Sequence, residues 1–209
     1  MLRTKIISLL LAGCTAAVLP TAATEEAPSF AEDFEGRLDG GWTWLRPDPQ
    51  DWCLRQGGPE IRNRPGDAGS VRNALLRPAP DRTNGTWIIE VTVRHLQPPT
   101  GQYEQAGITW YSGGEPVFKF VKELVDGVLM MIPGRQPMPA ASVRLRLTVT
   151  GNRYVAEYQP DAAGPFHRAA TGELPAASSD QISLQCYHGP AGDEHWVRFD
   201  DFRIAVSAE

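Results

Sequence analysis

Six polar side chains between residues 105 and 146 have types and spacings that suit carbohydrate binding. They are Gln105, Tyr111, Lys119, Glu123, Arg144 and Arg146. Each alternates with apolar neighbours, so in an extended strand it points to the face opposite the apolar one. Planar donors and acceptors can bind sugar hydroxyls, and an aromatic ring can stack on the apolar side of a pyranose. If their strands are neighbours, one concave sheet face carries all six side chains and could hold an oligosaccharide.

The same alternation is typical of an ordinary solvated sheet face. Cross-strand ion pairs on such a face contribute only about 0.2–1 kcal/mol each and need no ligand. The polar pattern alone does not separate these two interpretations.

The tryptophans also have two interpretations. The chain contains six, and three of them, Trp42, Trp44 and Trp52, lie near the start of the expected domain. Trp44 and Arg46 share the parity of Trp42, and we expect them at the rim of the ligand groove. Large aromatic side chains more often fill protein cores, however, and the core is the alternative for each tryptophan.

The elements that must position these residues are short β-strands. The segment 143–149 places apolar residues at odd positions and polar residues at even ones. Segments 87–94, 105–111, 154–158, 181–187 and 196–206 have the same period of two. Glycine- and proline-rich turn signals separate them. Regular short strands without an amphipathic helix predict an all-β, two-sheet antiparallel sandwich over residues 30–206.

The amino-terminal residues predict export. Arg3 and Lys5 precede an apolar run, 6–12, that is too short to span a bilayer. The run ends in Leu-Ala-Gly-Cys14, which resembles a bacterial lipobox. This resemblance implies a signal peptide over 1–13, lipidation of Cys14 and a membrane tether over 14–29, with the protein periplasmic or at the cell surface. The alternative is ordinary cleavage after Ala23.

Charge and cysteine content restrict the partners. The formal net charge is −5 and no basic face stands out, which argues against nucleic acid. Cys53 and Cys186 form an even pair in an oxidising compartment, so they are a candidate disulfide, with two separate buried thiols as the alternative. No zinc-like spacing occurs, and we predict neither a metal nor another cofactor, although calcium stays open. We expect a monomer that contacts the membrane only through its lipid.

Several segments, in order, resemble known concanavalin A-like domains. They are 42–47, 103–108 with its Gln-Ala-Gly strand, Lys119 with Glu123, and the closing 199–204. This order is similar to the C-terminal module of bacterial β-xylosidases and to the "regulation of enolase" family. The resemblance covers roughly residues 30–206 and implies a jelly roll of two sheets whose concave sheet can carry a ligand groove.

The sequence therefore favours an exported lipoprotein with a non-catalytic, carbohydrate-binding sandwich domain. A glycoside hydrolase or polysaccharide lyase is the alternative. Hydrolases need two carboxylates that flank the scissile bond, and no Glu-x-Asp-x-x-Glu strand occurs. A lyase could draw on Tyr111, Tyr187, His188 and Lys119 if folding brings them together. A structural module that docks a protein is the second alternative.

Overall fold

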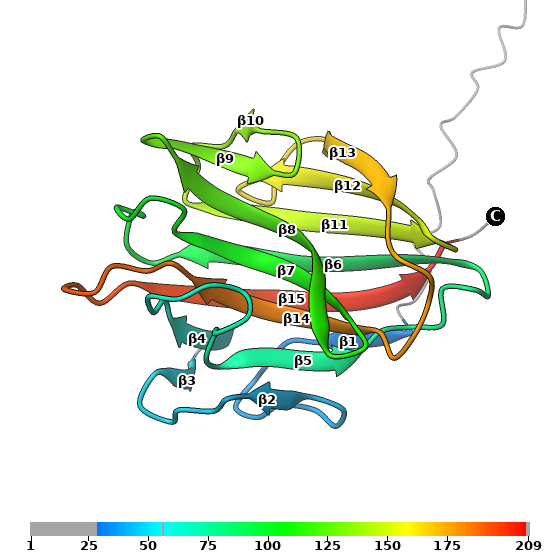
Figure 1. The fold of residues 1–209 in the computed structure, drawn as a ribbon, viewed down its shortest axis with the longest axis horizontal. Coiled ribbons are helices and arrows are strands. Elements are labelled where there is room, and N and C mark those ends of the chain that lie inside the picture. Colours follow the sequence, from blue (N-terminus) through cyan, green and yellow to red (C-terminus); the bar gives the residue numbers. More distant parts are fainter. Residues whose placement is uncertain (1–28, 56, 208–209) are drawn as a thin grey trace, which may run out of the picture.

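The computed structural model describes residues 29–55 and 57–207, which form a sandwich of two antiparallel sheets (Figure 1). The predicted signal peptide, Cys14 and nearly all of the predicted tether lie outside these residues. No helix occurs in the part of the chain that is described. The predicted all-β, two-sheet jelly-roll sandwich is therefore confirmed.

One sheet has eight strands in the order β13-β12-β11-β6-β15-β4-β3, with β1 paired to β15. The bounds of its strands are β1 (Phe30–Glu32), β3 (Trp52–Arg55), β4 (Gly58–Arg62), β6 (Thr86–His95), β11 (Ser142–Thr150), β12 (Arg153–Pro160), β13 (His167–Glu173) and β15 (Trp196–Val206).

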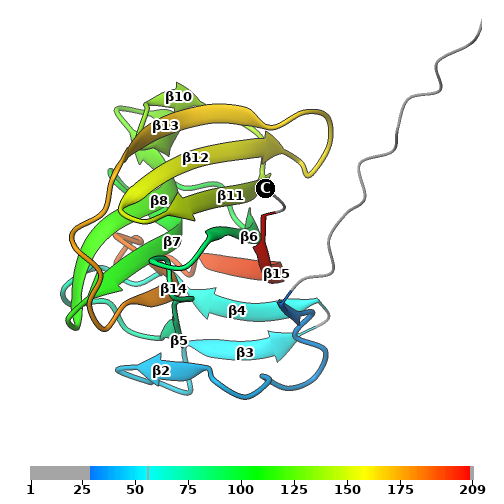
Figure 2. The same cartoon turned by 90° about the vertical axis from the view of Figure 1, so that its right-hand side faces the viewer.

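The other sheet has seven strands in the order β10-β9-β8-β7-β14-β5-β2. Its strands are β2 (Thr43–Leu45), β5 (Ala74–Pro78), β7 (Gln105–Ser112), β8 (Glu115–Val125), β9 (Val128–Ile132), β10 (Gln136–Pro137) and β14 (Gln181–Tyr187). Figure 2 shows the two sheets facing each other, with β7 and β8 in one layer and β11 and β12 in the other.

The core fills the space between the sheets. In β11, Val143, Leu145 and Leu147 are fully buried, and Leu145 and Leu147 pair with Val91 and Ile89 of β6. The seven-stranded sheet contributes its own alternating apolar set from β7, β8 and β14. Each strand buries one face, so the period-two pattern decides which side chains point outward.

The predicted disulfide between Cys53 and Cys186 is wrong, because both cysteines are free thiols. Cys53 lies on the edge strand β3 of the eight-stranded sheet, whereas Cys186 belongs to β14 of the other sheet. The Cys186 thiol is buried in the core and donates to the Ile61 carbonyl oxygen over 3.7 Å. Burial also raises the pKa of this thiol, which makes it inert.

The expectation that six polar residues share one face is wrong for Arg144 and Arg146. Their strand, β11, belongs to the eight-stranded sheet, whereas β7 and β8 belong to the seven-stranded one. Both arginines lie on the outer face of their sheet around Glu90, whose side chain is fully buried. The Nε atoms of Arg144 and Arg203 donate to Glu90 Oε2 over 3.0 and 2.7 Å, and Arg146 donates to Oε1. This is a cross-strand ion network.

The Glu90 network links stability to pH. Burial raises the pKa of this carboxyl, but hydrogen bonds from Arg203 and Arg146 and the charges of Arg146 and Arg144 outweigh burial, so its pKa lies below the usual value of 4.5. A group with a depressed folded pKa stabilises the protein above its unfolded pKa and loses that contribution as the pH falls.

We predict that Glu90→Gln lowers the free energy of unfolding by about 3 kcal/mol at pH 7, the lower end for breaking a buried ion pair, because the three arginines retain some solvent contact. Urea denaturation measures this difference. It should shrink as the pH falls from about 4.5 through the lower pKa that Glu90 has in the folded protein, because the wild-type carboxyl then becomes protonated. Glu157→Gln is the control, since Glu157 lies in register with Arg146 but forms no ion pair among the described residues. An equal Glu90→Gln difference at acid and neutral pH would contradict this account.

Candidate functional site

The outer face of the seven-stranded sheet is polar and yet buried. On β7, Gln105 and Thr109 are each 1% exposed, and on β14, Ser183 and Gln185 are fully buried. Their alternate neighbours, such as Ile108 and Leu184, belong to the core. These polar side chains therefore point outward from the sheet but are shielded from solvent.

The connection between β4 and β5 forms part of this shield. Ala68 and Val71 from this segment pack with Leu76 and Tyr187 in a small apolar cluster on the outer face. The Tyr111 hydroxyl donates to the Ala68 carbonyl oxygen over 3.3 Å, which ties the segment to β7.

One hydrogen-bond network on this face is centred on Lys119. Its Nζ donates to Glu123 Oε2 over 2.7 Å and to Gln105 Oε1 over 2.9 Å. Gln105 lies opposite Glu123 in the register of β7 and β8. The Glu123 side chain is 6% exposed and that of Lys119 is 35% exposed, so the carboxylate is buried and the ammonium group partly reaches solvent.

A second network joins β7 and β14. The Tyr111 hydroxyl and the Ser183 hydroxyl both donate to Gln185 Oε1, over 3.0 and 2.9 Å. Burial raises the pKa of Tyr111, so it stays protonated and serves as a donor at neutral pH. The network fixes the Gln185 amide and leaves its Nε2 without a hydrogen-bond partner among the described residues.

Gly107 separates the two networks at the centre of the face. It pairs with Val121 of β8 and Gln185 of β14. An added Cβ would lie 2.4 Å from the Phe120 carbonyl oxygen and 2.8 Å from Val121 Cα, and the backbone has a φ of +157°. Only glycine is compatible with this close approach of β7 to β8.

A pocket of about 210 Å³ opens on the same face. Its lining residues are Ala68, Thr109, Pro116, Val117, Phe118, Lys119 and Tyr187. The Thr109 hydroxyl is buried and has no hydrogen-bond partner within the described residues. The pocket thus combines an unpartnered hydroxyl, an ammonium group and an aromatic side chain.

Of the predicted ligand-binding residues, Lys119 lines this pocket. Gln105 and Glu123 accept hydrogen bonds from Lys119, and Tyr111 donates to the carbonyl oxygen of Ala68, another lining residue. Arg46 follows β2, and its Nη1 donates to the Val71 carbonyl oxygen over 3.0 Å, so it helps to hold the covering segment.

Trp44 does not lie at a groove rim. It packs on the core, with its ring centroid 4.5 Å from that of Trp52. The inward face of β2 carries Trp44, so its expected position is wrong.

Thr109, Ser183 and Gln185 are members of the site that the sequence pattern did not single out, and Tyr187 was a candidate only for the alternative of a lyase. The alternation in 105–111 already predicts that Thr109 points outward. The segment 181–187 carries the corresponding signal, because its polar residues alternate with Ile182, Leu184 and Cys186. What the sequence lacks is the information that β14 pairs with β7.

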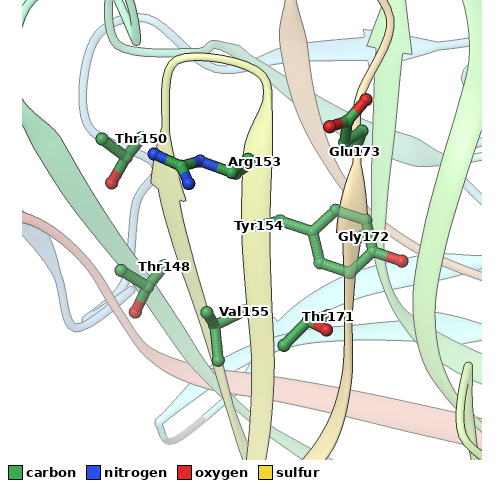
Figure 3. A pocket seen from close by; sticks show the side chains of 8 residues that line it. All are labelled: Thr148, Thr150, Arg153, Tyr154, Val155, Thr171, Gly172 and Glu173. Carbon is green, nitrogen blue, oxygen red and sulfur yellow. The ribbon is translucent and has the colours of Figure 1, made fainter.

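A wider depression of about 510 Å³ lies at the ends of β11, β12 and β13 (Figure 3). Tyr154 lies over Gly172 there, and Arg153 and Glu173 stand at one end of it. Arg153, Thr171 and Glu173 are exposed, and none of the lining side chains carries a buried polar atom without a partner. The depression therefore lacks the unsatisfied buried groups that distinguish the smaller pocket.

Neither a metal-binding cluster nor a membrane-spanning helix occurs among the described residues. No group of three or more His, Cys, Asp or Glu side chains there is placed to hold a metal ion. Residues 29–55 and 57–207 also contain no helix that is long and apolar enough to cross a membrane.

Comparison with solved structures establishes the fold. The chain matches a GH43 protein, BlXynB, from Bacillus licheniformis with a TM-score of 0.66 and 19% identity, covering 90% of this chain and 41% of that one. A xylan β-1,4-xylosidase from Bacillus halodurans C-125 gives a TM-score of 0.63 and 17% identity, covering 91% and 41%. An alginate lyase from a Corynebacterium species gives 0.50 and 13%, covering 72% and 77%.

The fold is that of a concanavalin A-like module. The expected resemblance to the C-terminal modules of β-xylosidases is thus confirmed for the fold. This chain spans about 41% of the length of the two Bacillus proteins. No protein-family model and no curated protein matches the chain.

The unpartnered Thr109 hydroxyl predicts an unusual response to mutation. A buried hydroxyl without a partner destabilises a protein by about 1–3 kcal/mol, so we expect Thr109→Val to raise the free energy of unfolding by about 1 kcal/mol. Ser183→Ala is the matched variant, because the Ser183 hydroxyl is bonded to Gln185 and its loss should destabilise by about 1 kcal/mol. Chemical denaturation of both variants measures these changes. Equal destabilisation by both would show that Thr109 has a partner in solution.

Proposed function

We propose that this protein is an exported bacterial lipoprotein whose concanavalin A-like module binds poly- or oligosaccharide without catalysis. The anchor is the lipid on Cys14, and the location is the periplasm or the cell surface. The binding site is the pocket on the outer face of the seven-stranded sheet.

The observation that carries this proposal is the unpartnered Thr109 hydroxyl beside Lys119 and Tyr187. A sugar hydroxyl can both donate and accept, so it can complete the hydrogen bonding of Thr109 and accept from Lys119 Nζ. The Tyr187 ring, which is 4% exposed, supplies an apolar surface next to these groups.

The size of the pocket limits what it can take. Its volume of about 210 Å³ is below the roughly 300–1,000 Å³ of sites that enclose drug-sized ligands. The pocket therefore suits one sugar residue or the end of a chain. The rest of a polymer would run over the neighbouring surface.

The absence of acids supports binding without hydrolysis. No Asp or Glu is among the described residues that line the pocket. The neighbouring acid, Glu123, is ion-paired to Lys119. Hydrolases instead place two carboxyl groups about 5–9.5 Å apart across the scissile bond.

The structural neighbours support carbohydrate as the ligand class. Their names describe a xylosidase and an alginate lyase, both of which act on sugar polymers. At 13–19% identity these likenesses establish the fold alone, so the ligand class is part of the proposal.

A polysaccharide lyase is the second candidate, because Tyr187 and Lys119 line the same pocket and the His188 ring lies 5.4 Å from that of Tyr187. Burial raises the pKa of Tyr187, with smaller contributions from Glu123, Tyr111 and Asp67. A phenolate base is therefore scarce at neutral pH, which makes elimination the weaker candidate.

A glycan-array screen of the full-length protein, with products assayed on every hit, tests the proposed function. We expect saturable binding without products. Thr109→Val and Lys119→Met should weaken binding of the hit by about tenfold each, as expected for the loss of one hydrogen bond to a bound ligand. Thr148→Val, in the wider depression, is the control that should bind normally. New unsaturated ends would favour the lyase, new reducing ends a hydrolase, and a silent array a protein-docking module.

Lipidation is tested separately. Mass spectrometry of protein purified from bacterial membranes should find Cys14 as the first residue, carrying acyl chains. Cys14→Ser should release the protein into the soluble fraction. A mature chain that begins at Thr24 would instead support ordinary cleavage after Ala23 and contradict the anchor.

A further inference from the structure

A second pocket, of about 300 Å³, lies between the two sheets and away from the candidate carbohydrate site. It is lined from both sheets, by the end of β6, the connection that follows it, β8, β9 and the residues before β11. Most of its wall is apolar, formed by Leu96, Pro98, Pro99, Leu129 and Pro139. The rest of the lining consists of Arg94, Ala141 and two buried nitrogen-bearing side chains, His95 and Lys122.

Lys122 occupies an inward-pointing position on β8 and is fully buried. Its Nζ donates to the carbonyl oxygens of Ala140 and Ala141, both of which are neutral. No carboxylate forms an ion pair with it within residues 29–55 and 57–207. Burial lowers its pKa to about 8, against a smaller opposing effect of Asp161, so most Lys122 is charged at neutral pH. A buried cation without a counter-ion is costly.

His95 is 5% exposed, and its Nε2 has no hydrogen-bond partner among the described residues. Burial, together with the charges of Lys122 and His195, lowers its pKa to about 3, so the imidazole is neutral. A neutral imidazole can donate one hydrogen bond. His195 itself is bonded through Nδ1 to Glu104 Oε1 over 2.8 Å, so this acid is engaged away from Lys122.

We propose that this inter-sheet pocket binds a small monocarboxylic acid with a compact apolar body. The ligand carboxylate accepts hydrogen bonds from Lys122 Nζ and His95 Nε2, and the body packs against the proline and leucine walls. The anion supplies the counter-ion that Lys122 lacks and the partner that His95 lacks. Apolar walls disfavour a strongly hydrated polar ligand such as a sugar, so the two pockets take different chemical classes.

Protonation of Lys122 makes binding dependent on pH. The anion binds the ammonium form, so affinity should be nearly constant between about pH 6 and 7 and fall above about pH 8 as Lys122 loses its proton. The other charged groups near the pocket are Arg94, which is part of its lining, Asp161, whose charge acts on Lys122, and the hydrogen-bonded pair of Glu104 and His195.

Isothermal titration of the full-length protein with benzoate tests this proposal, with neutral benzamide as the isosteric control. We expect benzoate to bind at pH 6.5, and to bind at least about tenfold more weakly at pH 9.5. Benzamide should bind at least about tenfold more weakly than benzoate at pH 6.5. Equal affinity for the two compounds, equal affinity at the two pH values, or no heat with benzoate at any concentration would overturn the proposal.

Two variants locate the site. Lys122→Met should abolish benzoate binding, whereas Arg153→Met, which removes an exposed cation elsewhere, should leave it unchanged. Leu129→Trp fills the pocket and leaves both nitrogen-bearing residues in the chain, so it should also abolish binding while circular dichroism stays native. This variant decides the question if Lys122→Met does not fold. Benzoate binding that survives Leu129→Trp would place the ligand elsewhere and overturn the assignment.

Discussion

Every feature of this protein depends on the burial of one apolar face from each sheet against the other. A strand directs alternate side chains to opposite faces, so a strand that supplies Leu145 and Leu147 to the core must present Arg144 and Arg146 outward. The same constraint on β7 places Ile108 and Trp110 inside and Gln105 and Thr109 outside. The polar networks on the two outer faces are therefore consequences of the way in which the core is filled.

The period-two pattern is local, and for this reason it predicts the inward and outward faces well. The outward positions of Gln105, Tyr111, Lys119 and Glu123 follow from their apolar neighbours alone. Which sheet a strand joins depends on pairing between distant segments, and no residue in 143–149 shows that β11 pairs with β6 and β12. The alternation alone therefore cannot show that Arg144 and Arg146 lie on a different sheet from Lys119. The inward position of Trp44 and the separation of Cys53 from Cys186 have the same origin, because both depend on how the first strands are divided between the sheets.

Strand β8 has a buried lysine that the alternation of polar and apolar residues does not explain. Its outward lysine, Lys119, forms an ion pair with the carboxylate of Glu123. Its inward lysine, Lys122, donates hydrogen bonds only to backbone carbonyl oxygens among the described residues. A lysine at a core position contradicts the apolar pattern of Phe118 and Phe120, and the contradiction is visible in the sequence. The sequence does not show why Lys122 is there, because the pocket that Lys122 lines is also formed by the residues before β11 and the connection after β6. Departures from a regular pattern therefore mark positions at which a site can be sought.

The pairing of β1 with β15 determines at which sheet the described chain enters the sandwich. The described chain enters the sandwich through Phe30–Glu32, and these residues add to the eight-stranded sheet opposite Ile204, Arg203 and Phe202. The buried polar networks around Lys119 and Tyr111 lie on the far side of the other sheet. An attachment through the amino-terminal side of the described domain would therefore join the eight-stranded sheet, and the candidate site lies on the opposite outer face of the sandwich.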